Sequence, residues 1–238
     1  MKDGAFYFNG VYSLDYELVI QSRPDRSFPI RRTNTYTVSG RNGTVYQSKD
    51  TYDNSTLSLS LVFLSEPESY RLEQVSEWFN TADYVEFIPY FDDKHSYRAK
   101  VVDKVTVQNK RSFGKAYTLD LTLSVYPMKF VIDALDPVTL TGEQTIFNTS
   151  SLRSEPTITL YGDGSLSLTV NNVSYQYVNV NGKITINTEE RTVYDENGQP
   201  APSKALGLDF PFFNEGQNHI STSADHYEVV KKFVRLAV

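Results

Sequence analysis

Residues 55–80 read STLSLSLVFLSEPESYRLEQVSEWFN, and the spacing of the apolar residues changes within this stretch. Up to residue 64, leucines and a phenylalanine fall at every second position, which is the period of a strand with one buried face. Apolar residues then recur at spacings of three and four, the period that lines one face of a helix. That second set consists of Leu72, Val75, Trp78 and Phe79. The stretch therefore predicts a strand over residues 55–64 and a helix over residues 66–80.

The residues before the helix predict how it starts. Ser65 is a favourable capping residue, Pro67 suits a first helical turn, and Glu68 stands three residues after the serine. This combination is typical of a capping box at a helix N-terminus. We therefore expect Ser65 to cap the helix.

The two-residue period dominates the rest of the chain. It recurs in residues 112–126, where Pro127 is expected to end the strand, and in residues 165–170. Residues 226–236 alternate more weakly and favour a closing strand, with a helix as the alternative. Since one helical segment stands among strands, the sequence predicts an all-β fold with one helix.

Turn residues divide the first half into segments. Asn9-Gly10 predicts a hairpin between a strand at Phe6 and a strand from Val11 to Ile20. Residues 22–35 contain two prolines and are expected to form an exposed loop, and residues 38–44 hold two turn glycines. Strands at residues 84–90 and 97–107 are expected to pair, with a turn at residues 108–111.

Turns about every ten residues in the second half indicate a sandwich or a barrel. Asn181-Gly182 is the strongest of these turn signals. A two-residue Asn-Gly loop is typical of a hairpin, so residues 173–180 are expected to pair with residues 183–187. Gly162-Asp163-Gly164 is interpreted as another hairpin turn rather than a phosphate-binding loop.

The charges fall unevenly along the chain, which has a formal net charge of −6. Residues 1–131 hold 16 basic and 16 acidic residues, whereas residues 132–238 hold 7 basic and 13 acidic ones. The composition also shifts to small polar and acidic residues near position 132. We therefore predict two domains, 1–131 and 132–238. Sequence-specific nucleic-acid binding is not expected, because neither part has the excess of basic residues that phosphate contacts require.

Several classes of site find no support in the composition. The chain has no cysteine, which excludes disulfides, thiolate metal ligands and a thiol nucleophile. No run of apolar residues is long enough for a membrane helix. The aromatic residues, 17 Tyr, 14 Phe and 1 Trp, suit both half-buried strands and protein interfaces.

No candidate catalytic or metal site stands out. His95, His219 and His226 have no metal-ligand spacing, and no nucleophile or nucleotide motif occurs. Adjacent carboxylates in a strand point to opposite faces, so Asp92-Asp93 and Glu189-Glu190 predict solvated charges rather than an acid–base pair. The lone Trp78 is interpreted as a core anchor rather than a sugar-stacking platform. We expect a protein without enzyme activity, metal or cofactor.

Several segments, in a fixed order, resemble the distal tail protein (Dit) family of long-tailed, non-contractile bacteriophages. The segments are Phe6–Gly10, Val38–Gly43, Trp78-Phe79, Ser154–Gly164, Ile184–Asn187, Val193–Asp195, Phe210-Pro211 and Glu215–Asn218. The resemblance implies structural roles for Gly40, Arg41, Gly43, Trp78, Pro156, Gly162, Gly164, Pro211, Gly216 and Asn218. The chain departs from the family at residues 208–213, which are unusually aromatic, and its second domain is too short for the arm that some members insert.

The resemblance implies an N-terminal β-rich domain with a helix that closes a hexameric ring, and a C-terminal galectin-like β-sandwich. The ring would join the tail tube to the baseplate hub at the distal end of the virion tail, after assembly in the host cytoplasm. Its partners would be the tail tube protein, the tape measure protein and the tail-associated hub protein. DNA would only pass through the channel. Strand edges that pair around a closed ring are no longer exposed, which fits this arrangement.

Candidate ring interfaces are the tyrosine-rich strands of residues 84–126 and the loop at residues 22–35. Two other functions stay open from the sequence. One is a carbohydrate-binding module that recognises host surface glycans through the sandwich, and the other is a cell-wall hydrolase.

Overall fold

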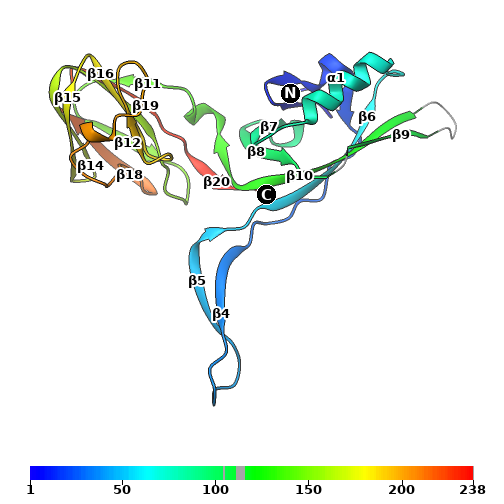
Figure 1. Cartoon of the computed structure of the whole chain (residues 1–238), viewed down its shortest axis with the longest axis horizontal. Coiled ribbons are helices and arrows are strands. Elements are labelled where there is room, and N and C mark those ends of the chain that lie inside the picture. The colour runs from blue at the N-terminus through cyan, green and yellow to red at the C-terminus, as the bar shows by residue number, and fades with distance from the viewer. Residues whose placement is uncertain (104, 111–115, 238) are drawn as a thin grey trace. The chain divides into compact units, whose positions relative to one another are not determined.

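The computed structural model describes residues 1–103, 105–110 and 116–237. The chain forms two compact units (Figure 1), one from Met1 to Lys129 that also includes the chain from Leu236 onward, and one from Phe130 to Arg235. The sequence analysis placed the whole C-terminal end in the second domain. The chain instead returns to the first unit, where buried Ala237 joins the core and its backbone N–H donates to the Pro127 carbonyl over 2.9 Å.

The first unit is built on one large sheet with the strand order β2-β1-β7-β8-β10-β6-β3. Strands β9 and β20 also pair with β10. The strands of this sheet are β1 (Phe6–Phe8), β2 (Val11–Tyr12), β3 (Leu18–Ile20), β6 (Ser55–Phe63), β7 (Val85–Pro89), β8 (His95–Val101), β9 (Thr106–Lys110), β10 (Ala116–Val131) and β20 (Val234–Leu236).

Strands β6 and β10 show why the leucine pattern decides this fold. Their antiparallel register places Leu57 opposite Leu123, Leu59 opposite Leu121 and Leu61 opposite Leu119. All six leucines are buried, whereas the serines between them point to the other face. The predicted strand at residues 55–64 is confirmed, and its apolar face forms the floor of the first core.

The predicted helix is also confirmed, as α1 (Ser69–Phe79), the single α-helix in the ranges that the structure covers. Its predicted start is wrong, because Glu68 occupies the capping position and makes no side-chain cap bond. The Ser65 hydroxyl donates instead to the carboxylate of Glu17, which also accepts a hydrogen bond from Arg71 over 2.5 Å. The serine is therefore engaged by another segment and cannot cap the helix.

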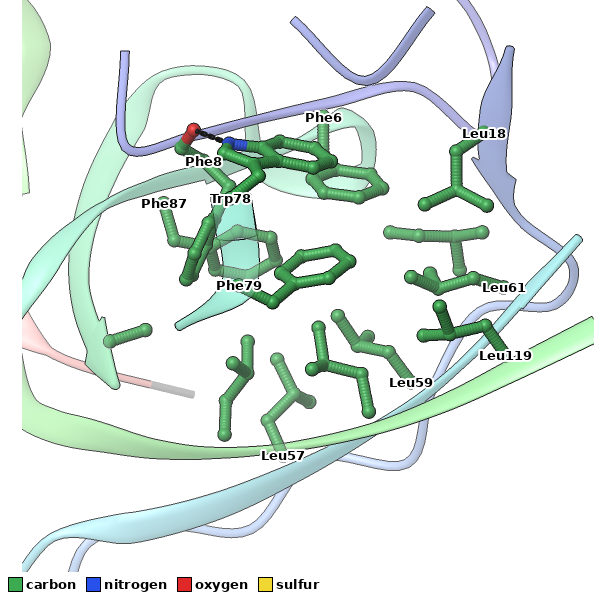
Figure 2. Packing of buried hydrophobic residues seen from close by; sticks show 14 of the residues in the cluster. Phe6, Phe8, Leu18, Leu57, Leu59, Leu61, Trp78, Phe79, Phe87 and Leu119 are labelled. Carbon is green, nitrogen blue, oxygen red and sulfur yellow. Dashed lines mark hydrogen bonds between the residues drawn. The ribbon is translucent and has the colours of Figure 1, made fainter. Parts of the chain in front are cut away.

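Trp78 lies at the centre of the first core, and Figure 2 shows it among the phenylalanines of β1 and the helix. Its ring stacks on Phe6 at 5.8 Å between centroids and on Phe79 at 4.6 Å. Its indole N–H donates to the Phe8 carbonyl over 2.7 Å, which satisfies the polar atom inside the core. Trp78 is therefore a core residue that fastens the helix to β1.

We predict that Trp78→Ala lowers the free energy of unfolding of the first unit by about 3–5 kcal/mol, since it removes a large buried ring. Trp78→Phe removes the indole donor and with it the buried bond to the Phe8 carbonyl, which costs about 1–3 kcal/mol. Urea unfolding followed by circular dichroism measures both changes. Tyr70→Ala is the matched control on the same helix, because Tyr70 is exposed. Equal losses in all three variants would contradict this account.

Residues 22–35 are not entirely a loop, which corrects the sequence analysis. From Arg31 onward they form β4 (Arg31–Tyr36), which pairs with β5 (Val45–Tyr52) in a separate two-stranded sheet. The predicted turn at residues 38–44 joins them, with Gly40 and Gly43 at positive φ. We call β4, β5 and this turn the arm; it extends away from the rest of the first unit (Figure 1). Apolar and polar residues do not alternate along β4, because neither face of this strand is buried.

Other predicted boundaries in the first unit also change. The expected strand from Val11 to Ile20 is interrupted by a 3-10 turn, η1 (Ser13–Tyr16), after which Glu17 adopts a left-handed conformation. Buried Ser13 explains the interruption, because its hydroxyl accepts the backbone N–H of Phe6 over 3.1 Å.

The predicted turn at residues 108–111 is wrong for Gln108 to Lys110, which belong to β9 and pair with β10. Residues 111–115, with the start of the predicted strand, lie outside the described residues. Pro127 does not end β10, because the pairing with β6 already stops at Val125. Its missing N–H therefore breaks no bond to β6.

The second unit is a β-sandwich of two sheets around one core. One sheet has the order β11-β19-β13-β16-β17 and the other β12-β18-β14-β15. The strands are β11 (Val138–Leu140), β12 (Gln144–Asn148), β13 (Thr157–Tyr161), β14 (Gly164–Val170), β15 (Val173–Val180), β16 (Lys183–Asn187), β17 (Thr192–Tyr194), β18 (Gly216–Thr222) and β19 (His226–Val230). The turn spacing predicted either a sandwich or a barrel, and the structure is a sandwich.

The predicted hairpin at Asn181-Gly182 is wrong in its pairing. Strand β15 pairs with β14, whereas β16 pairs with β13 in the other sheet. The turn is therefore a corner between the two sheets of the sandwich. Tyr177 and Val180 of β15 and Ile184 of β16 are all buried in the shared core. An Asn-Gly turn permits the chain reversal, but the burial of both apolar faces decides which strands pair.

The end of the chain differs from the single predicted strand. Residues 226–236 form β19 and β20, separated by residues 231–233, and Lys232 has a positive φ of 47°. Short 3-10 turns also occur at η2 (Tyr90–Asp92), η3 (Ile132–Ala134) and η4 (Pro202–Lys204). Across the described ranges, no helix has the length and apolar character needed to span a membrane.

Candidate functional site

The most connected group of charged side chains lies in the first unit, around Asp92. Its carboxylate accepts hydrogen bonds from Lys129 Nζ over 2.6 Å and from the Tyr97 hydroxyl over 2.5 Å, and lies 2.6 Å from His95 Nδ1. Lys129 is buried, although lysine is rarely so unless it is paired. We call these four residues the Asp92 cluster.

The electrostatics of the cluster favour one fixed protonation state. Burial tends to raise the pKa of Asp92, but the hydrogen bonds from Lys129, Tyr97 and His95 outweigh it and lower the pKa. Burial raises the pKa of Tyr97, and its bond to Asp92 adds to the effect. A carboxylate held ionised beside a phenol held protonated is a stable hydrogen-bonded arrangement. The cluster therefore ties η2 to β8 and β10.

We predict that the first unit loses stability below about pH 4 in part through Asp92. Since its pKa in the folded state lies below the unfolded value of 3.8, its contribution is present above 3.8 and is lost as the pH falls through the folded pKa. Thermal unfolding between pH 7 and pH 2 should therefore show a shallower acid slope for Asp92→Asn. Asp83→Asn is the exposed control, and an unchanged slope for Asp92→Asn would contradict the assignment.

The adjacent carboxylates do not form acid–base pairs. Asp92 belongs to the cluster, whereas Asp93 pairs with the N-terminal amino group at 2.9 Å. Glu189 pairs with Lys232 at 3.0 Å, whereas Glu190 accepts a hydrogen bond from the Tyr194 hydroxyl. The two carboxylates of each pair therefore bind separate partners.

The three histidines also lie apart. His95 contacts Asp92, His219 lies 3.2 Å from the Thr145 hydroxyl, and His226 stacks on Tyr161 at 4.3 Å between ring centroids. Among the residues with described positions, no group of three or more His, Cys, Asp or Glu side chains could hold a metal ion.

The residues singled out by the family resemblance occupy turns and cores rather than one site. Gly40, Arg41 and Gly43 form the tip of the arm, and Trp78 lies in the first core. In the second unit, Gly162 and Gly164 flank the turn between β13 and β14 at positive φ, but these strands belong to different sheets, so the predicted hairpin at this turn is wrong. Buried Pro156 precedes β13, Pro211 is also buried, and Gly216 begins β18 at positive φ.

Asn218 has the clearest structural role in that set. It is fully buried, and its amide group donates to the carbonyls of Asn214 and Gly216 over 2.9 and 3.0 Å. Its side-chain oxygen accepts hydrogen bonds from the Asn214 backbone N–H and the Asn171 side chain over 2.8 and 2.7 Å. Asn218 therefore fixes the turn that leads into β18.

The arm is the candidate assembly surface of the first unit. Its strands and the segment that leads into it expose apolar side chains: Phe28 at 70%, Ile30 at 74%, Tyr36 at 49% and Tyr46 at 70%. A two-stranded hairpin is at best marginally stable alone in water, and its exposed apolar side chains make the arm a candidate interaction site. The sequence analysis found part of this surface at residues 22–35. Strand β5 was not predicted, because apolar and polar residues do not alternate in a strand that is exposed on both faces.

Cross-strand polar contacts hold the arm in shape. Arg31 of β4 contacts both Asp50 at 3.0 Å and the Tyr52 hydroxyl at 2.9 Å on β5. At its base, the guanidinium groups of Arg23 and Arg26 lie 5.7 and 5.4 Å from the ring centre of Phe91. These contacts orient the arm while leaving its apolar side chains exposed.

The other predicted interface, the strands of residues 84–126, is mostly internal to the large sheet, where β7, β8 and β10 each pair on both sides. Its exposed apolar side chains include Tyr84 and Val107. The ends of the sheet order are the short strands β2 and β3, and on β3 the backbone N–H of Ile20 donates to the Gly4 carbonyl over 2.7 Å.

No family model and no curated protein sequence matches the chain. Among solved structures, the chain is similar to the Dit protein (gp 19.1) of phage SPP1, described as a paradigm of the hub adsorption apparatus in phages that infect Gram-positive bacteria. The identity is 16%, the match covers 98% of this chain and 99% of that one, and the TM-score is 0.72. The chain is also similar to the baseplate of phage p2 in its activated conformation with strontium, at 11% identity and a TM-score of 0.51, covering 93% and 91% of the two chains.

At these identities the similarity concerns the fold. The match to the SPP1 protein extends over both units, and the predicted all-β fold with one helix is confirmed. This chain has a Dit-like fold.

Proposed function

We propose that this chain is a structural component of a phage tail tip, a Dit-type hub subunit without enzyme activity. The observation that carries the proposal is the match over 98% of this chain and 99% of the SPP1 Dit protein. A shared sandwich alone would be weak support, because common folds serve many functions. Here two different units recur together in the same order, which is far more specific.

The finer proposal is a hexameric ring that joins the tail tube to the baseplate hub and leaves a channel for DNA. The tail tube, tape measure and tail-associated hub proteins are its proposed neighbours, at the distal end of the virion tail. A ring needs a head-to-tail interface that closes on itself. The arm fits such an interface, since it presents apolar side chains and unpaired strand edges that a neighbouring copy can cover.

The equal numbers of acidic and basic residues in the first 131 positions also agree with a channel wall. A strongly basic wall would hold DNA through its phosphates and slow its passage. A nearly neutral one lets DNA slide.

We predict that the purified chain forms particles near six times 27.1 kDa, alone or with the tail tube protein of its own phage. Light scattering after size exclusion, at several concentrations, measures the mass. A strict monomer at the highest concentration, with and without the tube protein, would contradict the ring.

The arm gives a sharper test of the same interface. Ile30→Glu, in the segment that leads into the arm, with Tyr46→Glu on β5 places two charges on the exposed apolar surface, and we predict a loss of the oligomer with little change in melting temperature. The fold should tolerate the change, because both side chains are already exposed. Phe147→Glu is the matched control, since Phe147 is 60% exposed on β12 of the second unit. An oligomer that persists in the arm variant would exclude the arm from the interface.

A further inference from the structure

In the second unit, an isolated β-bridge between two segments places several side chains on one outward face. Ser154 and Phe213 exchange two backbone hydrogen bonds, at 2.9 and 3.0 Å, and both side chains are fully buried. In an extended segment, neighbouring side chains point to opposite faces. Arg153 and Glu155 on one bridged segment, and Phe212 on the other, therefore all point outward beside one another.

These side chains line a groove. One hollow of about 300 Å³ is bordered by Arg153, Glu155, Arg191 and Phe212, and by Tyr175 on β15. A second hollow of about 240 Å³ continues along β15 towards residues 205–209. The two hollows share Val173, Tyr175 and Asp209, so they are neighbours, and we call them together the groove. Two adjoining hollows leave room for a ligand of more than one unit.

Arg153, Arg191 and Glu155 of the groove lie near one another, but neither arginine forms a direct hydrogen bond to the glutamate. The guanidinium groups of Arg153 and Arg191 each lie 4.0 Å from the same carboxylate oxygen of Glu155. This separation exceeds that of a direct hydrogen bond, so donors and acceptor can share a hydroxyl group placed between them. Arg153 also lies over the Phe212 ring, 5.2 Å from its centre, which orients its planar guanidinium.

Two further features show that contacts within the protein hold the groove in shape. Arg191 has a φ of 54°, an uncommon backbone conformation for arginine, and its N–H bonds to the Thr188 carbonyl over 3.3 Å. The Thr188 hydroxyl in turn donates to the Pro211 carbonyl over 2.8 Å, which links the Arg191 turn to the aromatic segment. Burial raises the pKa of the Tyr175 hydroxyl, and the Asp209 carboxylate adds to the effect. The Tyr175 hydroxyl donates to the Phe210 carbonyl over 3.4 Å.

We propose that this groove binds a carbohydrate chain. Arg153 and Arg191 balance Glu155 and Asp209 in charge, which favours a neutral ligand over a phosphate or another strong anion. Forked donors beside carboxylate acceptors match the neighbouring hydroxyls of a sugar ring. Aromatic walls from Tyr175 and Phe212 suit the apolar face of the same ring.

The proposal goes beyond the ring function, which needs no ligand. It also concerns the segment at residues 208–213, whose aromatic residues departed from the family pattern. Phe212 and Phe210 of that segment border the groove. The extra aromatic residues therefore have a role in this inference that the ring function does not give them.

The full chain should be tested on an array of immobilised neutral, N-acetylated and uronic-acid oligosaccharides, followed by calorimetric titration of the best neutral oligosaccharide. We expect binding in the millimolar range or tighter. Arg191→Ala and Glu155→Gln should each weaken it at least about tenfold, since each removes a charge-assisted hydrogen bond. Arg235→Ala is the matched control, because Arg235 is exposed and lies outside the groove.

Three results would overturn the proposal: no binding to any oligosaccharide, binding that both groove variants leave unchanged, or displacement of the sugar by inorganic phosphate. Circular dichroism of each variant shows whether it is folded, and Glu155→Gln preserves the size of the side chain if Arg191→Ala does not fold. The oligomer mass measured on the same variants separates the two proposals. A groove variant that loses sugar binding should keep the mass of the unaltered protein.

Discussion

The burial of one leucine face beneath one helix determines the first unit. Strands β6 and β10 bring their leucines into register, and α1 covers the central aromatic cluster through Val75, Trp78 and Phe79. The indole bond to the Phe8 carbonyl then ties the helix to β1, at the other end of the sheet order from β6. Because these contacts complete the core of the first unit, the arm can remain outside it. Its apolar side chains are then available for another molecule.

The two proposed interaction surfaces, the arm and the groove, lie on different kinds of structure. The arm of the first unit is a two-stranded hairpin with little packing of its own, which suits a contact completed by a neighbouring copy. The groove of the second unit lies on a sandwich whose backbone bridge and side-chain hydrogen bonds fix it beforehand. A preformed groove suits a small ligand, because little conformational freedom is lost on binding.

The fold could be predicted from the sequence where a buried face imposes a regular spacing of apolar residues. Where no face is buried, that spacing is missing and the prediction failed. The leucines of β6 and the helical spacing of Trp78 and Phe79 report directly on a buried face. The arm was missed as strands, because β4 and β5 bury neither face. At Asn181-Gly182 the local turn chemistry was right, but it does not encode which sheet the next strand joins. The Ser65 cap failed for a similar reason, since Glu17 lies 48 positions earlier.

The groove could not be predicted, because its residues come from four separate segments and meet only after the sandwich folds. Imaging tests the proposed ring most directly. Electron microscopy of the purified chain, with its proposed tail tube partner added, should show closed rings with sixfold symmetry and an open centre. Particles without a closed ring, or a ring with a blocked centre, would contradict this account.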